Sequence, residues 1–480
     1  MRDQPRHRPP DQTTSRPIIS ARALSFLLLI VALVAGGALR FSGLGALEMS
    51  PDEGASWAAA SAPTVAQVIA RQPALNPGEL PIHDLILHGW IALFGSSMAA
   101  MRALSAAFGV ASILLVYLVV RELFEESALT GDDVRTVAGL SALVFAVNLV
   151  TLKYSREARM YPLMLAAILA QVAMFLRALR VGGVVNYAAL VVLTAIAIAS
   201  NFAAVLIPAT EGLWLLYLVA RAGWRLNNAR ARRAWVLAAV LAAGGLILVP
   251  KLFSSLHAAS AGTVGAWRKA PAFYAPFALF NKATGSFAFP ILATLALWGA
   301  VRGWRRGARD AIALAILLMW APPILMLAAS YAIAPVFVER YALWCFVPFF
   351  ILVALGIFEC PGDLVRGATL LLVLSFSAGH IVSYDRKPHD AQYREAIAAA
   401  DSALKPGEVM TVVPSYAIEV LRYYLPADQQ DKAVRYDPSA STAAVLILGD
   451  QNLAPGAAQS YRKEYPNVVA RLRGVTVRRR

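Results

Sequence analysis

The sequence predicts a polytopic α-helical membrane protein that ends in a small α/β domain. Of its 480 residues, 59% are hydrophobic and only 15% are charged, whereas soluble globular proteins carry about 25% charged residues. Apolar segments long enough to cross a bilayer recur from residue 18 to residue 383, and arginine-rich loops separate them. The net charge of +15 therefore fits positive-inside loops and not a surface that follows nucleic-acid phosphates.

The membrane region is expected to follow a Pro- and Arg-rich cytoplasmic N-terminus, residues 1–17, that is disordered. The apolar run of residues 18–39 is too long for a signal-peptide core, so we expect an uncleaved first helix. Later segments bring the total to about eleven spans: 101–120, 134–152, 160–179, 186–200, 202–221, 234–251, 286–303, 311–331, 341–358 and 367–383. Arginine clusters near residues 177–180, 225–233 and 302–309 place the N-terminus inside.

This topology puts a long first loop, residues 42–100, on the periplasmic side of a bacterial inner membrane. Segments 64–72 and 81–94 within the loop are short and partly apolar, so we expect them to lie in the membrane interface. The membrane domain as a whole is predicted to cover residues 18–383.

The composition changes from residue 384 onward. Residues 391–404 have a helical pattern, whereas 409–413 and 444–448 read as short strands between Pro- and Asp-containing turns. We therefore predict a periplasmic α/β domain over residues 384–480.

Two adjacent carboxylates, Asp52 and Glu53, stand near the start of the first loop. Acidic residues are scarce in this chain, 29 against 44 lysines and arginines. Ser50 followed by Glu53 is a capping-box pattern, and Pro51 occupies the favoured first helical position. Such a capped helix start would also hold Asp52 rigidly at the membrane surface, as a positioned catalytic group requires.

The predicted topology gathers other polar side chains on the same outer face. They come from four stretches: Glu79, His83 and His88; Lys153, Arg156, Glu157, Arg159 and Tyr161; Lys251, His257, Arg268 and Lys269; Glu339, Arg340 and Tyr341. Ionisable groups near membrane depth are costly and by default mark functional sites. For each arginine alone the alternative is snorkelling to the interface, and the spacing of the histidines gives no metal signature.

A series of motifs runs in order along the chain: Arg40-Phe41 with Leu44-Gly45, Pro51-Asp52-Glu53, Pro81, Leu93-Phe94-Gly95 with Arg102, Ser155 to Tyr161, and Glu339-Arg340-Tyr341 with Pro348. Over about residues 20–385 this set resembles the GT-C superfamily of integral-membrane glycosyltransferases. Within that superfamily it looks like family 39, the protein mannosyltransferase and aminoarabinose transferase group. The resemblance implies a GT-C-like fold and a polyprenyl-phosphate sugar donor used on the periplasmic face.

Carried over by position, the resemblance implies that Asp52 is the general base and that Glu79 is a second acidic site residue. The chain departs from the family pattern at two places. Leu80 stands where aminoarabinose transferases carry a lysine, which puts that reaction in doubt. The histidine that precedes the proline in protein mannosyltransferases is missing, and only His83, beyond Pro81, could substitute for it.

The chemistry of such a transfer explains the remaining expectations. A base must deprotonate the acceptor hydroxyl, and fixed cations must stabilise the departing phosphate. We expect inversion with Asp52 as base, and Glu53 or Glu157 orienting hydroxyls. The expected phosphate ligands are Arg159 and Arg340, with Arg156 and Lys269 behind them. The expected substrate contacts are Glu79, His83, Tyr161 and Tyr341.

Other functions and partners stay open at this point. A lipid or polysaccharide transporter would favour charged or broken helices near the bilayer midplane and internal repeats, and the sequence displays neither. If the outer domain were the working part and the spans only its membrane anchor, far fewer spans would be needed. Neither the sugar nor the acceptor, whether glycan, lipid or protein, is defined, although membrane lipids are expected partners. The acids are compatible with a divalent metal near a phosphate but too sparse to require one.

Overall fold

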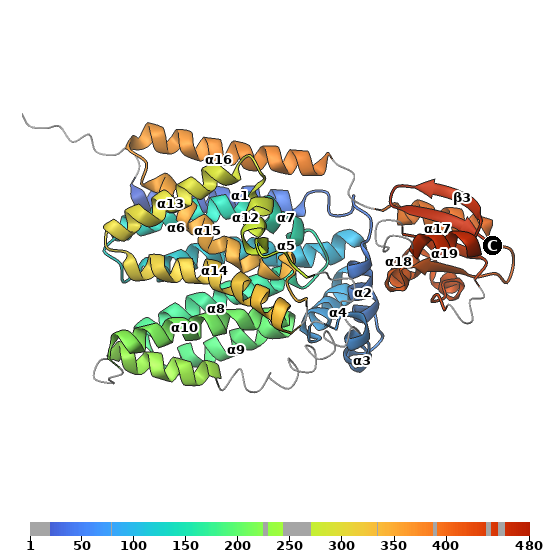
Figure 1. Ribbon diagram of the computed structural model, residues 1–480, viewed down its shortest axis with the longest axis horizontal. Coiled ribbons are helices and arrows are strands. Elements are labelled where there is room, and N and C mark those ends of the chain that lie inside the picture. The colour runs from blue at the N-terminus through green and yellow to red at the C-terminus, as the bar shows by residue number, and fades with distance from the viewer. Residues whose placement is uncertain are drawn as a thin grey trace, which may run out of the picture.

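The computed structural model describes residues 20–77, 79–223, 229–242, 270–333, 335–386, 391–437, 443–449 and 457–480. Figure 1 shows three parts: a bundle of long helices, a layer of short helices (α2, α3 and α4, blue) and a small C-terminal domain (red). The short helices lie between the bundle and the C-terminal domain. This middle layer carries the acidic first loop, so the candidate site lies at one end of the bundle.

The bundle is made of the following helices: α1 Ala21–Phe41, α5 Met98–Phe124, α6 Gly131–Ala146, α7 Leu149–Ser155, α8 Tyr161–Val181, α9 Val184–Ser200, η1 Phe202–Val205, α10 Leu206–Arg221, a helix over 229–242, α12 Ala275–Thr284, α13 Phe289–Arg305, α14 Arg309–Ala332, η2 Glu339–Cys345, α15 Phe346–Phe358 and α16 Gly362–Asp385. Within the described ranges, seven segments are long and apolar enough to cross a membrane, or up to nine if the bent pairs α6–α7 and α12–α13 each count as one. The predicted class, a multi-pass helical membrane protein, is confirmed. The structure does not confirm the predicted count of about eleven spans.

Helices α13 and α15 pack against each other through small residues. At Gly356 of α15, an added Cβ would lie 2.1 Å from the backbone oxygen of Leu295 on α13. At Gly299 of α13, a Cβ would lie 2.2 Å from the oxygen of Leu352. Two backbones can approach this closely only where no side chain intervenes, which is a common device between membrane helices.

The layer of short helices contains α2 Pro51–Ala60, α3 Val65–Leu75 and α4 Ile82–Phe94. Helices α3 and α4 correspond to the short segments expected at the membrane interface. Buried residues of this layer and of the C-terminal domain belong to one apolar cluster. Burying apolar surface across this boundary stabilises the two parts together.

Polar contacts also join the C-terminal domain to the first loop. The Met49 amide donates to the Tyr424 hydroxyl at 2.9 Å, and the Arg394 amide donates to Glu48 Oε2 at 2.9 Å. The ring centroids of Trp57 and Tyr423 lie 5.3 Å apart in an edge-to-face arrangement. The domain therefore rests directly on the segment that carries Asp52.

The C-terminal domain contains a four-stranded sheet in the order β1-β2-β4-β3. Strands β1 (Met410–Val413) and β2 (Val445–Leu448) pair in parallel, whereas β4 (Val475–Arg479) pairs antiparallel with both β2 and β3 (Asn467–Leu472). The helices of the domain are α17 Tyr393–Ala403, η3 Ser415–Ala417, α18 Ile418–Tyr424, η4 Ala427–Lys432 and α19 Ala457–Glu464. The expected helix and both expected strands are present, and β3 and β4 complete a sheet that the sequence analysis did not foresee.

Candidate active site

The first turn of α2 has the geometry that its sequence predicts. The Ser50 hydroxyl accepts from the Glu53 amide at 3.3 Å, and Glu53 Oε2 accepts from the Ser50 amide at 3.0 Å. Pro51 occupies the first helical position. This capping box fixes the backbone of Asp52, which lies between the two capping residues.

The Glu53 carboxylate is enclosed by hydrogen-bond donors. Its side chain is 1% exposed. Arg102 Nε lies 2.7 Å from Oε1, Arg102 Nη2 lies 2.8 Å from Oε2, and the Ala158 amide donates to Oε1 at 2.9 Å. Burial alone would raise the pKa of Glu53, but the hydrogen bonds and charge of Arg102 lower it. These contacts indicate that Glu53 joins α2, α5 and the α7–α8 connection.

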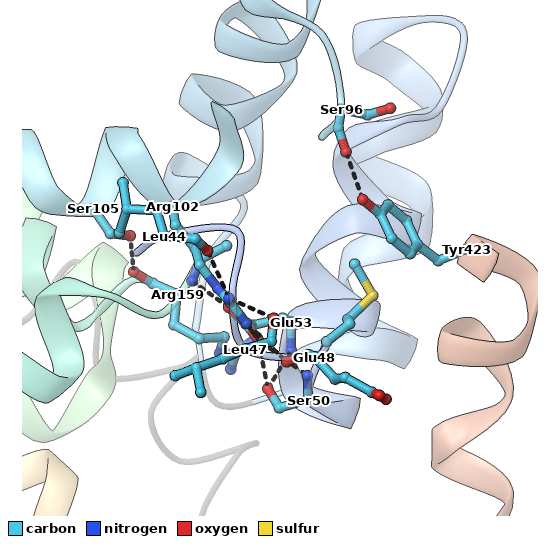
Figure 2. Close-up of polar contacts among 12 residues, drawn as sticks. Leu44, Leu47, Glu48, Ser50, Glu53, Ser96, Arg102, Ser105, Arg159 and Tyr423 are labelled. Atoms are coloured by element: carbon cyan, nitrogen blue, oxygen red, sulfur yellow. Dashed lines mark hydrogen bonds and ion pairs between the residues drawn. The ribbon is translucent and has the colours of Figure 1, made fainter. Parts of the chain in front are cut away.

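Arg102 uses its other donors on the loop that precedes α2. It donates to the backbone oxygens of Leu44, Leu47 and Glu48 at 2.8, 2.9 and 2.9 Å. Figure 2 shows the guanidinium among these oxygens and the Glu53 carboxylate. Arg102 belongs to one of the sequence motifs, but no role was predicted for it, although a single arginine at the start of a long apolar run is itself a signal.

The Asp52 side chain, in contrast, is 44% exposed. Its Oδ2 lies 3.0 Å from Nη1 of Arg340, which comes from the start of η2. The backbone oxygen of Asp52 accepts from Arg159 Nη1 at 3.0 Å. The structure thus places an accessible carboxylate beside a cation from a distant part of the chain.

Arg159 is buried and already has several protein partners. Besides the Asp52 oxygen, its Nη1 contacts Ser56 Oγ at 2.8 Å and Asn76 Oδ1 at 2.7 Å. Its Nη2 lies 3.6 Å from Glu79 Oε1. Burial opposes the charged guanidinium, but the carboxylates of Glu79 and Asp52 outweigh it and raise the pKa of Arg159. Arg159 therefore connects α2 with the segment that follows α3.

Glu79 lies on the other side of Arg159 and is also buried. Oε2 has no hydrogen-bond partner among the described residues. Burial raises the pKa of Glu79 well above its usual value, and Arg159 offsets this only in part because Asp84 and Asp52 act in the same direction as burial. Burial therefore favours the protonated form of Glu79 more than it does for an exposed carboxyl group.

His83 contacts Asp84. Its Nδ1 is 3.1 Å from Asp84 Oδ1, and Asp84 Oδ2 accepts from Asn76 Nδ2 at 3.1 Å. Neither Asp84 nor Asn76 was singled out from the sequence. The only sequence signal for these two residues is their position, because Asn76 lies shortly before Glu79 and Asp84 shortly after it.

Two tyrosines line the same region. The Arg340 guanidinium carbon lies 5.7 Å from the centroid of the Tyr161 ring, and that of Arg159 lies 5.9 Å from it. Tyr341 is 6.4 Å from Tyr161, centroid to centroid. Within the described part of the chain, the Tyr161 hydroxyl and the Arg340 Nε are buried without a hydrogen-bond partner. Polar atoms that stay unsatisfied when buried are costly, so both are suited to a ligand.

The other predicted residues lie apart from Asp52. Glu157 and Arg156 line a neighbouring cavity and do not contact the Asp52 carboxylate. Burial raises the pKa of Glu157 to about 7, partly offset by Lys153. Lys269, like Lys251, His257 and Arg268, lies outside the described residues. Lys282, which the sequence analysis missed, lies 2.7 Å from Glu339 beside Arg340.

Metal ligands do not cluster in the described ranges, where no three His, Cys, Asp or Glu side chains come together as an ion would require. The site shown by the structure is instead built from Asp52, Glu79, Arg159, Arg340 and Tyr161. It combines one accessible carboxylate, one buried carboxyl group, and a cation with an unused donor.

The fold of this chain is similar to folds already solved, as the family resemblance of the ordered motifs implied. Two solved structures carry this comparison. One is ArnT from Cupriavidus metallidurans bound to undecaprenyl phosphate, with a TM-score of 0.58, 13% identity, and coverage of 94% of this chain and 97% of that chain. The other is the archaeal oligosaccharyltransferase AglB from Archaeoglobus fulgidus in complex with an inhibitory peptide and a dolichol-phosphate. It has a TM-score of 0.56, 12% identity, and coverage of 89% and 69%.

No protein-family model and no curated protein sequence matches the chain. At 12–13% identity the likeness to these structures establishes the fold. The roles of individual residues have to be argued from the site itself.

Proposed function

We propose that this protein is a glycosyltransferase that moves a monosaccharide from a polyprenyl-phosphate donor to an acceptor hydroxyl on the periplasmic face of a bacterial inner membrane. The observation that carries the proposal is the pair formed by Asp52 and Arg340, 3.0 Å apart at the end of the bundle. A half-exposed carboxylate suits a general base, and a guanidinium beside it suits the phosphate. The polyprenyl phosphate and dolichol-phosphate bound by ArnT and AglB support this class of donor.

The proposed reaction is a single displacement at the anomeric carbon. Asp52 takes the proton of the acceptor hydroxyl as the oxygen attacks, and a new carbon–oxygen bond forms. The bond from the anomeric carbon to the phosphate oxygen breaks, and the polyprenyl phosphate leaves with the electron pair. Arg340 stabilises the charge that develops on it. Attack from the face opposite the leaving group gives inversion.

Arg340 is the cation best suited to the phosphate because its side chain is 28% exposed, against 8% for Arg159, and its ion-pair partner among the described residues is the accessible Asp52. Arg340 pairs with Asp52 in the structure. A phosphate dianion or diester would compete for the guanidinium, which would release the Asp52 carboxylate to accept a proton. Arg159, expected from the sequence to bind phosphate, is proposed here to position the Asp52 backbone and Glu79 instead.

The test is transfer from a synthetic polyprenyl-phosphate sugar by protein reconstituted in lipid. Asp52→Asn is expected to lower the transfer rate by about 100-fold or more, because positioned general bases contribute roughly 10²–10⁴-fold. Asp363→Asn, at an exposed carboxylate at the start of α16, is the control. Wild-type activity in the Asp52 variant would contradict the assignment of the base, and the absence of donor turnover by the wild type would contradict the proposed function.

A further inference from the structure

A cavity of about 180 Å³ adjoins the Glu53–Arg102 pair but is not lined by Asp52, Glu79 or Arg340. We call it the lateral cavity. One side of it is lined by the loop before α2 together with Glu53 and Arg102, and that loop includes Glu48. The remaining lining residues are Leu149, Leu152, Lys153, Arg156, Glu157 and Tyr384. Its volume is several times that of one water molecule, which occupies about 30 Å³ in the liquid.

The charged groups of the lateral cavity are incompletely paired. In the described part of the chain, Lys153 has no carboxylate within 4.0 Å, and its contact is the Tyr154 ring at 5.2 Å. Arg156 reaches the exposed Asp385 at 3.4 Å, and its buried Nε has no hydrogen-bond partner. A buried donor without a partner is unfavourable, so Arg156 Nε is suited to an anion that enters the cavity. Lys153, which has no carboxylate beside it among the described residues, can bind the same anion through its charge.

The cavity lies where lipid can reach it. Leu149 and Leu152 form an apolar cluster with Ile381, and Tyr384 packs against this cluster from the end of α16. Among the candidate spans that the structure describes, α16 has the smallest share of residues buried inside the protein, 11%, against 22–89% for the others. The cations Lys153 and Arg156 thus lie close to the apolar residues at the end of α16, the least buried of these spans. This combination suits an amphiphile better than a small soluble ion.

We propose that the lateral cavity binds the phosphate headgroup of an anionic membrane lipid through Lys153 and Arg156. The acyl chains of that lipid lie along α16 and the leucines of α7. Asp52 and Arg340 do not line the lateral cavity, although their charges act on Glu157.

Glu157 makes this binding sensitive to pH. The charged groups that face Glu157 or line the same cavity are Lys153, Arg156, Glu48, Glu53 with Arg102, Asp52 and Arg340. Because the pKa of Glu157 is raised to about 7, its carboxyl group is largely protonated at pH 6 and largely ionised at pH 8. An ionised Glu157 repels the anion, whereas the protonated form can donate a hydrogen bond to it.

The experiment measures lipid binding by native mass spectrometry of the full chain, released from nanodiscs of phosphatidylcholine with or without phosphatidylglycerol. Lys153→Gln is expected to weaken phosphatidylglycerol binding by at least about tenfold, the effect of one charge-assisted hydrogen bond. Arg386→Gln removes an equally charged, exposed residue at the end of α16 that does not line the cavity and is expected to leave binding unchanged. Equal affinity in the wild type and both variants would overturn the proposal.

Glu157→Gln provides a result that misfolding cannot imitate. This variant is expected to bind phosphatidylglycerol more tightly at pH 8 and to lose the difference between pH 6 and pH 8. Weaker binding, or an unchanged pH dependence, would contradict the role of Glu157. If inorganic phosphate binds the detergent-solubilised protein in a Lys153-dependent way while phosphatidylglycerol does not, the ligand is a soluble anion and the lipid assignment is wrong.

Discussion

Replacing Arg102 with methionine is expected to destabilise the site end of the protein by about 3–5 kcal/mol, the usual cost of removing one partner of a buried ion pair. Methionine keeps an apolar side chain but leaves the Glu53 carboxylate, 1% exposed, without its two guanidinium contacts. Three backbone oxygens, of Leu44, Leu47 and Glu48, lose their donor at the same time. The contact with Leu44 is buried and those with Leu47 and Glu48 are partly buried, so each lost contact adds to the cost.

The double variant Arg102→Met with Glu53→Met separates the two contributions. Removing the stranded carboxylate is expected to recover part of the loss, because an apolar pair can replace a buried ion pair at little cost. Recovery is expected to stay incomplete, since the three backbone oxygens still lack a donor. The effects of the Arg102 and Glu53 substitutions on the free energy of unfolding should therefore not add, and the coupling energy between them should lie well above zero.

The assay is the unfolding midpoint of wild type, both single variants and the double variant, measured in the same detergent or nanodisc. Because membrane proteins often unfold irreversibly, the ranking of midpoints at one heating rate is the quantity to compare. We expect wild type to be the most stable and Arg102→Met the least. A single Arg102 variant as stable as the wild type would refute the argument that this pair holds α2 to α5.

Three further predictions concern other parts of the protein. Arg340→Gln is expected to weaken polyprenyl-phosphate binding by at least about tenfold, measured by titration, whereas Lys282→Gln has a smaller effect; equal effects would remove Arg340 from the phosphate site. Because the pKa of Glu157 is higher in the folded chain than its ordinary 4.5, stability is expected to fall as pH rises from about 5 to 7, and Glu157→Gln should flatten that profile in a thermal melt. Gly356→Ala is expected to cost about 1–3 kcal/mol by overpacking against Leu295, and an unchanged melting midpoint would contradict that close approach.

Local signals allowed the start of α2 to be predicted in detail. The capping box depends on residues three apart, so Ser50 and Glu53 can be matched by spacing alone. The apolar segments likewise predicted the membrane helices because length and composition decide whether a helix can span. Which side chains meet across the bundle depends instead on helix packing, which the spacing of apolar residues does not encode.

The candidate site shows this limit most clearly. Topology placed Asp52 and Arg340 on one face, but only the fold shows their contact. Glu53 was expected to orient hydroxyls, and its partner Arg102 lies 49 positions away in the sequence, so no local pattern could reveal that the carboxylate is fully occupied. Arg159 presents the same difficulty, because its several protein partners become visible only in three dimensions.

The C-terminal sheet was predicted only in part. Strand β2 consists of Val445–Leu448, a continuous apolar run that is buried throughout, and such runs are recognisable in a sequence. Strand β3, Asn467–Leu472, is mostly exposed, and β4, Val475–Arg479, carries arginines. Edge and mixed strands of this kind have no regular alternation, so their sequences resemble those of loops.

The contact between Met49 and Tyr424 has a consequence for how the protein is made. Their hydrogen bond joins residues 375 positions apart, so the ribosome must add most of the membrane helices before the first loop acquires its outer support. The segment that holds Asp52 therefore lacks its contact with Tyr424 through nearly the whole of synthesis. It reaches its final environment only when the last part of the chain has been made and has folded against it.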